Sequence, residues 1–322
     1  MSLMSNRQQK ILFITANRMG DAVLSTGLLA WLLAKYPKAQ ITIACGSYAA
    51  QLFEAVPHLE RLIILNKKTW NRHWLKAWSL CIATRWDTIV DLRNSAVSRL
   101  LFTSKRYNYT RSSGQHKLID NAAILNITPL PPLHIWLSEE AQGEANRIMP
   151  TDRKVVALAP TANWPPKQWP LDRFIALAQK IAAPDGLLPG ATFLVFAAEH
   201  ERDYIKPLID SLPKNQCIEL IGHHLLTVAA CMSHCQLFVG NDSGLMHLAS
   251  AIGTPTIGLF GPGQDKIYAP WGEHCRSVRT LESCEELLSR IPNRHARSPN
   301  LMHGLEIGKV YEAAISLLNK ES

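Results

Sequence analysis

The sequence has no apolar run of the roughly 18–20 residues that a membrane-spanning helix needs. It begins with a polar stretch that leads directly into the strand-like Ile11–Ile14, without the apolar region and cleavage site of a secretory signal. Its seven cysteines, an odd number scattered through apolar segments, fit reduced, buried thiols better than a disulfide framework. We therefore expect a cytoplasmic protein with reduced thiols, whose contact with a membrane is at most peripheral.

Two nucleotide-binding fingerprints are also missing. No G-x-G-x-x-G follows the first strand-like segment, which argues against an oxidoreductase, and there is no Walker lysine-serine pair. Cys231 and Cys235, with His223 and His224 upstream, superficially suggest a metal site. Their spacing does not match paired ligands, and the two cysteines lie one helical turn apart in an apolar segment, which favours buried thiols. We expect neither a cofactor nor a divalent metal.

Short apolar runs alternate with segments of helical period along the whole chain. Ile41–Cys45 and Trp86–Leu92 are typical of buried strands, whereas Val23–Ala34 has the apolar spacing of a helix. Such alternation predicts βαβ units and therefore an α/β fold with doubly wound parallel sheets. A chain of 322 residues that is 47% hydrophobic has material for two cores.

A proline-rich segment, residues 128–135, predicts where one domain gives way to the next. Three prolines in four positions remove amide donors and block a helix, so we expect an extended crossover. With the boundary there or slightly later, we divide the chain into domains of residues 1–150 and 151–322. The last helical segment, Leu305–Leu318, should close the second domain and could pack back toward the first.

The most informative stretch, Leu237–Gly261, predicts a strand, a tight turn and the start of a helix. Ser243 can cap that helix, and Gly244 lets a ligand approach its first amides, so the turn suits a diphosphate. Asp242 would repel phosphate, and we expect it to bind sugar or ribose hydroxyls instead. Spacing alone equally allows Asp242 and Ser243 to be ordinary helix caps.

From Gly240 to Pro262 the sequence reads G-N-D-S-G-L-M-H-L-A-S-A-I-G-T-P-T-I-G-L-F-G-P. This run resembles the signature of glycosyltransferase family 9, the ADP-heptose lipopolysaccharide heptosyltransferases, and the resemblance extends over nearly the whole chain. It implies the GT-B architecture, with two Rossmann-like domains facing across a cleft, the acceptor on the first and the nucleotide sugar on the second. It also implies an inverting transfer of heptose from ADP-heptose onto the lipopolysaccharide inner core.

Lys167 lies before a Trp-Pro pair in a loop that is similar to the family's loop after the first strand of the donor domain. A lysine suits the charge that grows on a departing diphosphate, although a surface lysine in a proline-rich turn is the simpler alternative. Gly263 and Gln264 depart from the family, which usually has a hydroxyl residue and an acid there, and this leaves the sugar and base of the donor open. The donor-binding residues implied by the resemblance are Thr161, Lys167, Asn241, Asp242, Ser243, Gly244, His247, Gly261 and Pro262.

Asp21 matches the family's general base and, with Lys167, makes up the expected catalytic pair. It follows Gly20 at the start of the helix after the first strand, at the carboxyl edge of the sheet, where ligands bind. Displacement with inversion requires a group that takes the proton of the acceptor hydroxyl, and a carboxylate can do this. Without the resemblance, an aspartate that only complements the helix dipole would be favoured.

Basic residues gather in the first half of the chain. Eleven Lys and Arg lie between Asn66 and Leu118, against only Asp87 and Asp91. This excess suggests an anionic partner, although charge runs are commonly just a solvated face.

The resemblance implies that the partner is a Kdo-containing lipid A core rather than a nucleic acid. Arg18, Gly20 and Arg93 are the acceptor-binding residues we expect, because arginine forks suit carboxylates and phosphates.

Trp70, Trp74 and Trp78 recur every four residues among Lys and Arg. This pattern fits an interfacial helix resting on the inner membrane, yet tryptophans at helical spacing are more often core residues.

Two other functions stay open on the sequence alone. The same fold could use a UDP- or GDP-sugar, or the chain could bind a nucleotide sugar without turnover.

Overall fold

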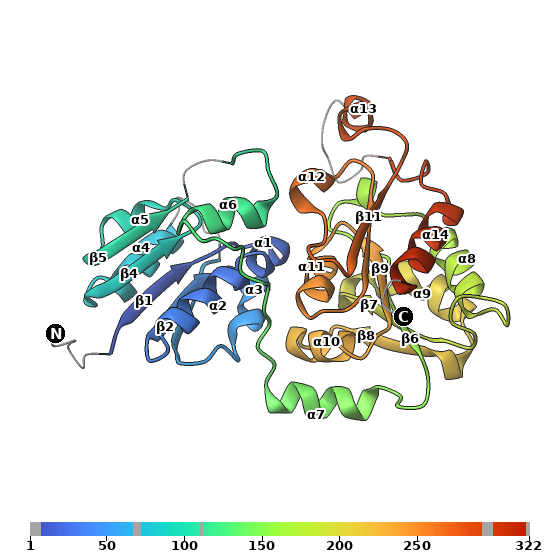
Figure 1. Ribbon diagram of the computed structural model, residues 1–322, viewed down its shortest axis with the longest axis horizontal. Helices are drawn as coiled ribbons and strands as arrows, with labels where there is room; N and C mark the ends of the chain where they lie inside the picture. The colour runs from blue at the N-terminus through green and yellow to red at the C-terminus, as the bar shows by residue number, and fades with distance from the viewer. Residues whose placement is uncertain (1–7, 67–71, 110–111, 292–298, 320–322) are drawn as a thin grey trace. The chain divides into compact units, whose positions relative to one another are not determined.

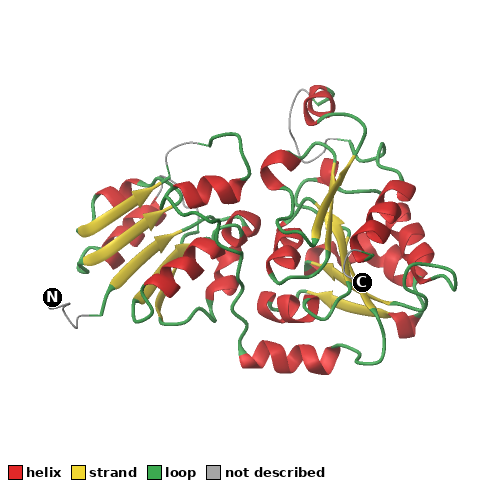
Figure 2. Ribbon diagram, viewed as in Figure 1, coloured by secondary structure: helices red, strands yellow, loops and turns green. Residues whose placement is uncertain are grey.

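The computed structural model describes residues 8–66, 72–109, 112–291 and 299–319. The chain forms two α/β units, Met1–Trp136 and Leu137–Ser322 (Figure 1). In each unit a parallel sheet carries helices on both sides, which confirms the predicted fold class (Figure 2).

The first unit contains a five-stranded sheet in the order β3-β2-β1-β4-β5. Its strands are β1 (Lys10–Ile14), β2 (Gln40–Cys45), β3 (Leu59–Ile64), β4 (Trp86–Asp91) and β5 (Thr103–Asn108). Its helices are α1 (Met19–Val23), α2 (Thr26–Lys35), α3 (Ser47–Ala50), the 3-10 turn η1 (Gln51–Phe53), α4 (Arg72–Cys81), α5 (Ala96–Arg99) and α6 (Lys117–Ala123). The central strand β1 is buried from Ile11 onward, as an apolar run covered on both faces must be.

The second unit contains a six-stranded sheet in the order β11-β10-β9-β6-β7-β8. Its strands are β6 (Val155–Ala159), β7 (Thr192–Ala197), β8 (Cys217–Ile221), β9 (Leu237–Asn241), β10 (Thr256–Phe260) and β11 (Cys275–Arg279). Its longer helices are α7 (Glu139–Ile148), α8 (Leu171–Ala182), α9 (Arg202–Ser211), α10 (Leu225–Met232), α11 (Gly244–Ala251) and α14 (Ile307–Leu318). Short turns of helix are η3 (Pro165–Lys167), η4 (Glu199–Glu201), η5 (Lys214–Gln216), α12 (Asp265–Tyr268) and α13 (Cys284–Ser289).

The core of the second unit lies between the sheet and helices α8, α9 and α14. Trp169 and Phe174 are fully buried there and meet edge to face, with ring centroids 5.0 Å apart. The indole of Trp169 also donates to the carbonyl oxygen of Leu305 at 2.8 Å. The terminal helix α14 therefore closes the second unit by packing against α8 and the β10–β11 edge, as the sequence predicted for this segment.

The proline-rich crossover passes the start of α2. The carbonyls of Pro131 and Pro132 lie so near Gly27 that a Cβ on this glycine would come within 3.0 Å of both, and the amide of His134 donates to the Thr26 hydroxyl at 3.2 Å. The two units divide between Trp136 and Leu137, earlier than the expected boundary at 150/151. Helix α7 belongs to the second unit because it packs on α10.

No helix in the described ranges is both long and apolar enough to cross a membrane.

Candidate functional site

Both sheets have a switch point, where the strand order reverses direction, and the residues of interest gather there. In the second unit the switch lies between β6 and β9, which pair in parallel with Ala159 opposite Gly240. The loops that follow these two strands therefore leave the same edge of the sheet side by side. Ligands of open α/β sheets bind at such a crevice.

Asn241, the last residue of β9, ties these two loops together. Its side-chain oxygen accepts from the amide of Trp169 at 2.9 Å, and its side-chain nitrogen donates to the carbonyl of Pro160 at 2.7 Å. The side chain is fully buried, and both ends of the amide are used within the protein. This geometry gives Asn241, which the resemblance placed among the donor-binding residues, a positioning role.

Lys167 and Asp242 meet at this edge. Lys167 ends the turn η3 in the loop after β6, and Asp242 follows β9; the ammonium donates to Oδ2 of the carboxylate in a close ion pair. The side chain of Asp242 is 9% exposed and that of Lys167 is 25% exposed. An ammonium has three N–H donors, so this pairing leaves Lys167 two for a ligand.

Helix α11 begins directly after this pair, at Gly244. Ser243 is its N-cap residue with an extended backbone (φ −147°, ψ 171°), yet its hydroxyl accepts no capping hydrogen bond, so the expectation that its side chain caps the helix is wrong. The Ser243 Oγ is buried and has no hydrogen-bond partner in the part of the chain described by the structure. The first amides of α11 lack intrahelical acceptors, as at every helix start.

The loop after β10 approaches the same carboxylate. A Cβ on Gly263 would lie 2.3 Å from Oδ2 of Asp242, so only a glycine permits the observed approach. Gly263 is the position at which the resemblance led us to expect a hydroxyl residue. Pro262 and Gly261, both buried, precede it.

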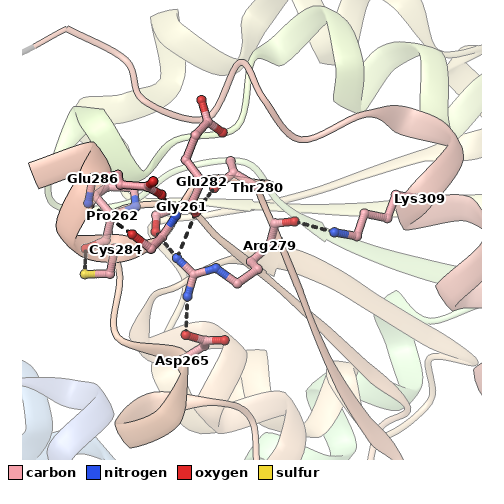
Figure 3. A network of polar contacts seen from close by, with 10 residues as sticks. Gly261, Pro262, Asp265, Arg279, Thr280, Glu282, Cys284, Glu286 and Lys309 are labelled. Atoms are coloured by element: carbon pink, nitrogen blue, oxygen red, sulfur yellow. Dashed lines mark hydrogen bonds and ion pairs between the residues drawn. The ribbon is translucent and has the colours of Figure 1, made fainter. Parts of the chain in front are cut away.

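Arg279, at the end of β11, organises this loop (Figure 3). Its guanidinium forms an ion pair with Asp265 and donates to the carbonyls of Gly261 at 3.0 Å and Glu282 at 3.3 Å. The thiol of Cys284 adds a contact of 3.1 Å to the carbonyl of Pro262. The sequence did not single out Arg279. Its partners Gly261 and Asp265 lie in the loop after β10, and the rest of strand β11 separates that loop from Arg279 along the chain.

The remaining predicted donor residues belong to the elements that meet at this edge. Thr161 is buried in the loop after β6, His247 is buried on α11, and Gly244 is half-buried at the start of that helix.

In the first unit the switch point lies between β1 and β4, where Ile14 pairs with Asp91. Asp21 is half-buried in the first turn of α1, directly after β1, with Gly20 beside it and Arg18 exposed at the helix start. The sequence-predicted base and acceptor residues are therefore together at one sheet edge.

Arg93 comes from the loop after β4 and is held in place from three sides. The buried carboxylate of Asp91 accepts from the Arg93 amide at 2.8 Å, and the guanidinium donates to Oδ1 of Asn17 at 2.6 Å. The guanidinium carbon lies 4.8 Å from the ring centroid of Trp74 on α4, a cation–π distance. Burial lowers the pKa of Arg93, and Asp91 opposes that shift. Asn17 and Trp74 were not among the predicted site residues.

The three regularly spaced tryptophans, Trp70, Trp74 and Trp78, differ in their surroundings. Trp70 lies outside the described residues, Trp74 is half-buried against the core, and Trp78 is 37% exposed. Cys231 and Cys235 are buried free thiols, as predicted, and no three His, Cys, Asp or Glu within the described ranges group as a metal site.

Comparison with known proteins gives a consistent result. The family model described as glycosyltransferase family 9 (heptosyltransferase) matches residues 83–293. Lipopolysaccharide heptosyltransferase 2 of Salmonella typhimurium is 23% identical over 84% of this chain and 88% of its own length. Lipooligosaccharide heptosyltransferase 2 of Campylobacter jejuni is 22% identical over 93% of this chain and 95% of its own.

Solved structures agree in fold. The family 9 glycosyl transferase of Veillonella parvula superimposes with a TM-score of 0.78 at 21% identity, covering 97% of both chains. The ADP-heptose heptosyltransferase II of E. coli gives a TM-score of 0.74 at 20% identity, covering 97% of this chain and 99% of that one.

These two doubly wound units, with a cation and a helix start at the switch point of the second, are those of a glycosyltransferase of the GT-B class. Because the family model covers well over half of the chain, the protein belongs to glycosyltransferase family 9.

Proposed function

We propose that this protein transfers a heptose from ADP-heptose onto the lipopolysaccharide inner core, with inversion at the anomeric carbon. The observation that carries the proposal is the Lys167–Asp242 pair at the switch point of the second unit, in a family whose relatives named above are heptosyltransferases. Structures of the E. coli heptosyltransferase WaaC with ADP and with ADP-2-deoxy-2-fluoro heptose support the choice of donor.

In the proposed reaction the diphosphate lies against the first amides of α11 and the ammonium of Lys167. As the bond from the anomeric carbon to the diphosphate oxygen breaks, negative charge grows on ADP, and the two Lys167 donors that Asp242 does not use stabilise it. Asp242 holds the ammonium in place, so little reorganisation is needed during the transfer.

On the acceptor side, Asp21 takes the proton of the attacking hydroxyl while its oxygen bonds to the anomeric carbon. Arg18 and Arg93 bind the carboxylates and phosphates of the acceptor, for which guanidinium forks are suited. No divalent metal takes part in this scheme. We place the reaction at the cytoplasmic face of the inner membrane, where the seven free thiols of the protein would stay reduced.

The test is a mass-spectrometric transfer assay with ADP-heptose and Kdo-containing core acceptors truncated before the heptose. We expect a product heavier by one heptose, undiminished by a chelator. Asp21→Ala should abolish turnover and leave the affinity for ADP, measured by calorimetry, nearly intact. Full activity of that variant would refute the assignment of the base.

A second donor class is favoured by one observation, the replacement of the usual hydroxyl residue by Gly263 against Asp242. Thermal-shift screening of ADP, UDP and GDP separates the two: stabilisation by UDP or GDP alone would overturn the ADP assignment. Binding without transfer to any core acceptor would instead indicate a non-catalytic binder.

A further inference from the structure

The segment from α4 to the turn before β5 combines large exposed apolar side chains with basic charges. We call it the α4 surface. Its apolar members, with their exposed fractions, are Leu75 (66%), Trp78 (37%), Leu80 (38%), Leu100 (65%) and Phe102 (73%). Soluble proteins scatter single apolar residues over their surface, whereas a concentration of this kind marks a contact with something else.

Hydrogen bonds join the two segments that carry these residues. Trp86, at the start of β4, donates from its indole to the carbonyl of Cys81 at 3.1 Å and from its amide to the carbonyl of Phe102 at 3.1 Å. The end of α4 and the turn before β5 are therefore neighbours. Between them lies a hollow of about 420 Å³ lined by residues 82–85 and 102–104.

The charges of this region have one sign. From residue 72 to residue 109 the only carboxylates are Asp91, which is buried, and Asp87, which is half-buried and accepts from the Lys10 amide at 2.8 Å. The exposed ionisable side chains of the same stretch are all basic: Lys76, Arg85, Arg99, Lys105 and Arg106. An apolar surface surrounded by cations matches a bilayer that carries anionic headgroups.

We propose that the α4 surface docks on an anionic bilayer, with Leu75 and Trp78 in the interface and the basic side chains on the headgroups. A second copy of the chain is the poorer occupant, because self-association would bring these like charges against each other. Tryptophan at this position suits a bilayer interface, since its ring is apolar and its N–H is polar.

Trp74, one helical turn before Trp78 on α4, connects this surface to the acceptor edge. Trp74 packs against the core of the first unit, and its ring lies under the guanidinium of Arg93. The helix that rests on the bilayer thus also positions an arginine at the sheet edge that carries Asp21. This part of the inference rests on the proposed function, since it takes the acceptor to be a membrane lipid with anionic sugars. Docking would bring that acceptor to the arginine.

Vesicle flotation tests docking without acceptor or turnover. We expect the wild-type protein to float with vesicles of phosphatidylcholine and phosphatidylglycerol, and not with phosphatidylcholine alone. Leu75→Ser with Trp78→Ser should lower binding at least tenfold, and Lys76→Gln should lower it about fivefold. Leu281→Ser is the matched control, because Leu281 is 88% exposed on the second unit and should not affect binding.

Wild-type protein that stays at the bottom of the gradient would overturn the proposal, as would a double variant that floats normally. A double variant that differs from wild type only in its oligomeric state, measured by analytical ultracentrifugation, would also overturn it and identify a protein contact. Unchanged thermal denaturation confirms that the variants are folded.

Kinetics test the connection to Arg93. With an acceptor embedded in vesicles, the double variant should lose at least tenfold in kcat/KM, and with a deacylated, water-soluble acceptor it should equal wild type. Trp74→Leu should raise the KM for both acceptors and leave the KM for the donor unchanged. Equal loss on both acceptors in the double variant, or a changed donor KM in Trp74→Leu, would overturn the connection, whereas flotation would still report on docking.

Discussion

Lys167 and Asp242, 75 residues apart in the chain, form an ion pair where the loops after β6 and β9 leave the sheet together. The pair has no net charge, so it does not by itself attract a diphosphate. Its value lies in orientation: the carboxylate fixes an ammonium that has two further donors beside the start of α11.

Lys167→Met should lower kcat by about 10²–10³-fold, the range seen when one donor that stabilises transition-state charge is removed. Methionine keeps the length and apolar stem of the side chain, although it leaves the nearly buried Asp242 carboxylate without its cation, so thermal denaturation should show a loss of stability in a folded variant. Steady-state kinetics with saturating acceptor provide the measurement. Lys206→Met is the control, because Lys206 forms an exposed ion pair with Asp210 at 2.8 Å and should be dispensable. An unaltered kcat in Lys167→Met would contradict the role given to the ammonium.

Asp242→Asn should separate binding from turnover. The amide keeps the shape of the side chain but no longer neutralises Lys167, so ADP should bind more tightly in calorimetry while kcat falls. Asp210→Asn, which removes the partner of Lys206 on the surface, should change neither quantity. Weaker ADP binding in Asp242→Asn would mean that the carboxylate contacts the donor directly, through the sugar or ribose hydroxyls predicted from the sequence.

Gly263→Ala should cost about 1–3 kcal/mol of stability and raise the donor KM, because the new Cβ would clash with Oδ2 of Asp242, only 2.3 Å away. Urea denaturation and donor kinetics measure the two effects. Gly143→Ala on α7 meets nothing within 4 Å and should stabilise the protein by about 0.5–1 kcal/mol. Normal stability and kinetics in Gly263→Ala would show that the loop shifts easily and that contact with Asp242 does not require a glycine at this position.

Asn241→Ala should destabilise the protein by about 2–6 kcal/mol, since two buried backbone groups would lose their partners at about 1–3 kcal/mol each. These groups are the carbonyl of Pro160 and the amide of Trp169. The free energy of unfolding in urea is the measurement, with the exposed Asn215→Ala as a control that should lie within about 0.5 kcal/mol of wild type. A loss below about 1 kcal/mol would mean that water replaces both bonds.

Stability should fall in alkaline solution because of the buried thiols. Burial raises the pKa of Cys45, Cys231 and Cys275 to about 12, whereas a thiol in the unfolded chain titrates near about 8.5. Below that pH both states are protonated and stability is complete; above it only the unfolded state loses protons, so the free energy of unfolding decreases until the folded thiols titrate. Urea denaturation at pH 7 and pH 10 measures the difference. Cys45→Ala should reduce the slope, and an unchanged slope would exclude this thiol as a contributor.

The strands that the sequence pattern missed all lie at the edges of the sheets. The central β1, β6 and β9 are uninterrupted apolar runs because both faces are covered. The missed strands β5, β8 and β11 are edges, with the sequences TSKRYN, CIELI and CRSVR. In β5 and β11 two charged side chains each protect the edge from pairing with another chain, and they remove the apolar pattern by which a strand is recognised.

By itself the sequence determined the class of fold, the family signature around Gly240–Pro262 and the positions at which Asp21 and Lys167 follow their strands. These are local properties, since apolar period and turn chemistry act over a few residues. Only the tertiary structure decided that Lys167 pairs with Asp242, that Gly263 presses on the same carboxylate and that Trp74 lies under Arg93. Such contacts join residues from segments far apart in the chain, and they exist because parallel strands bring the ends of these segments to one edge of a sheet.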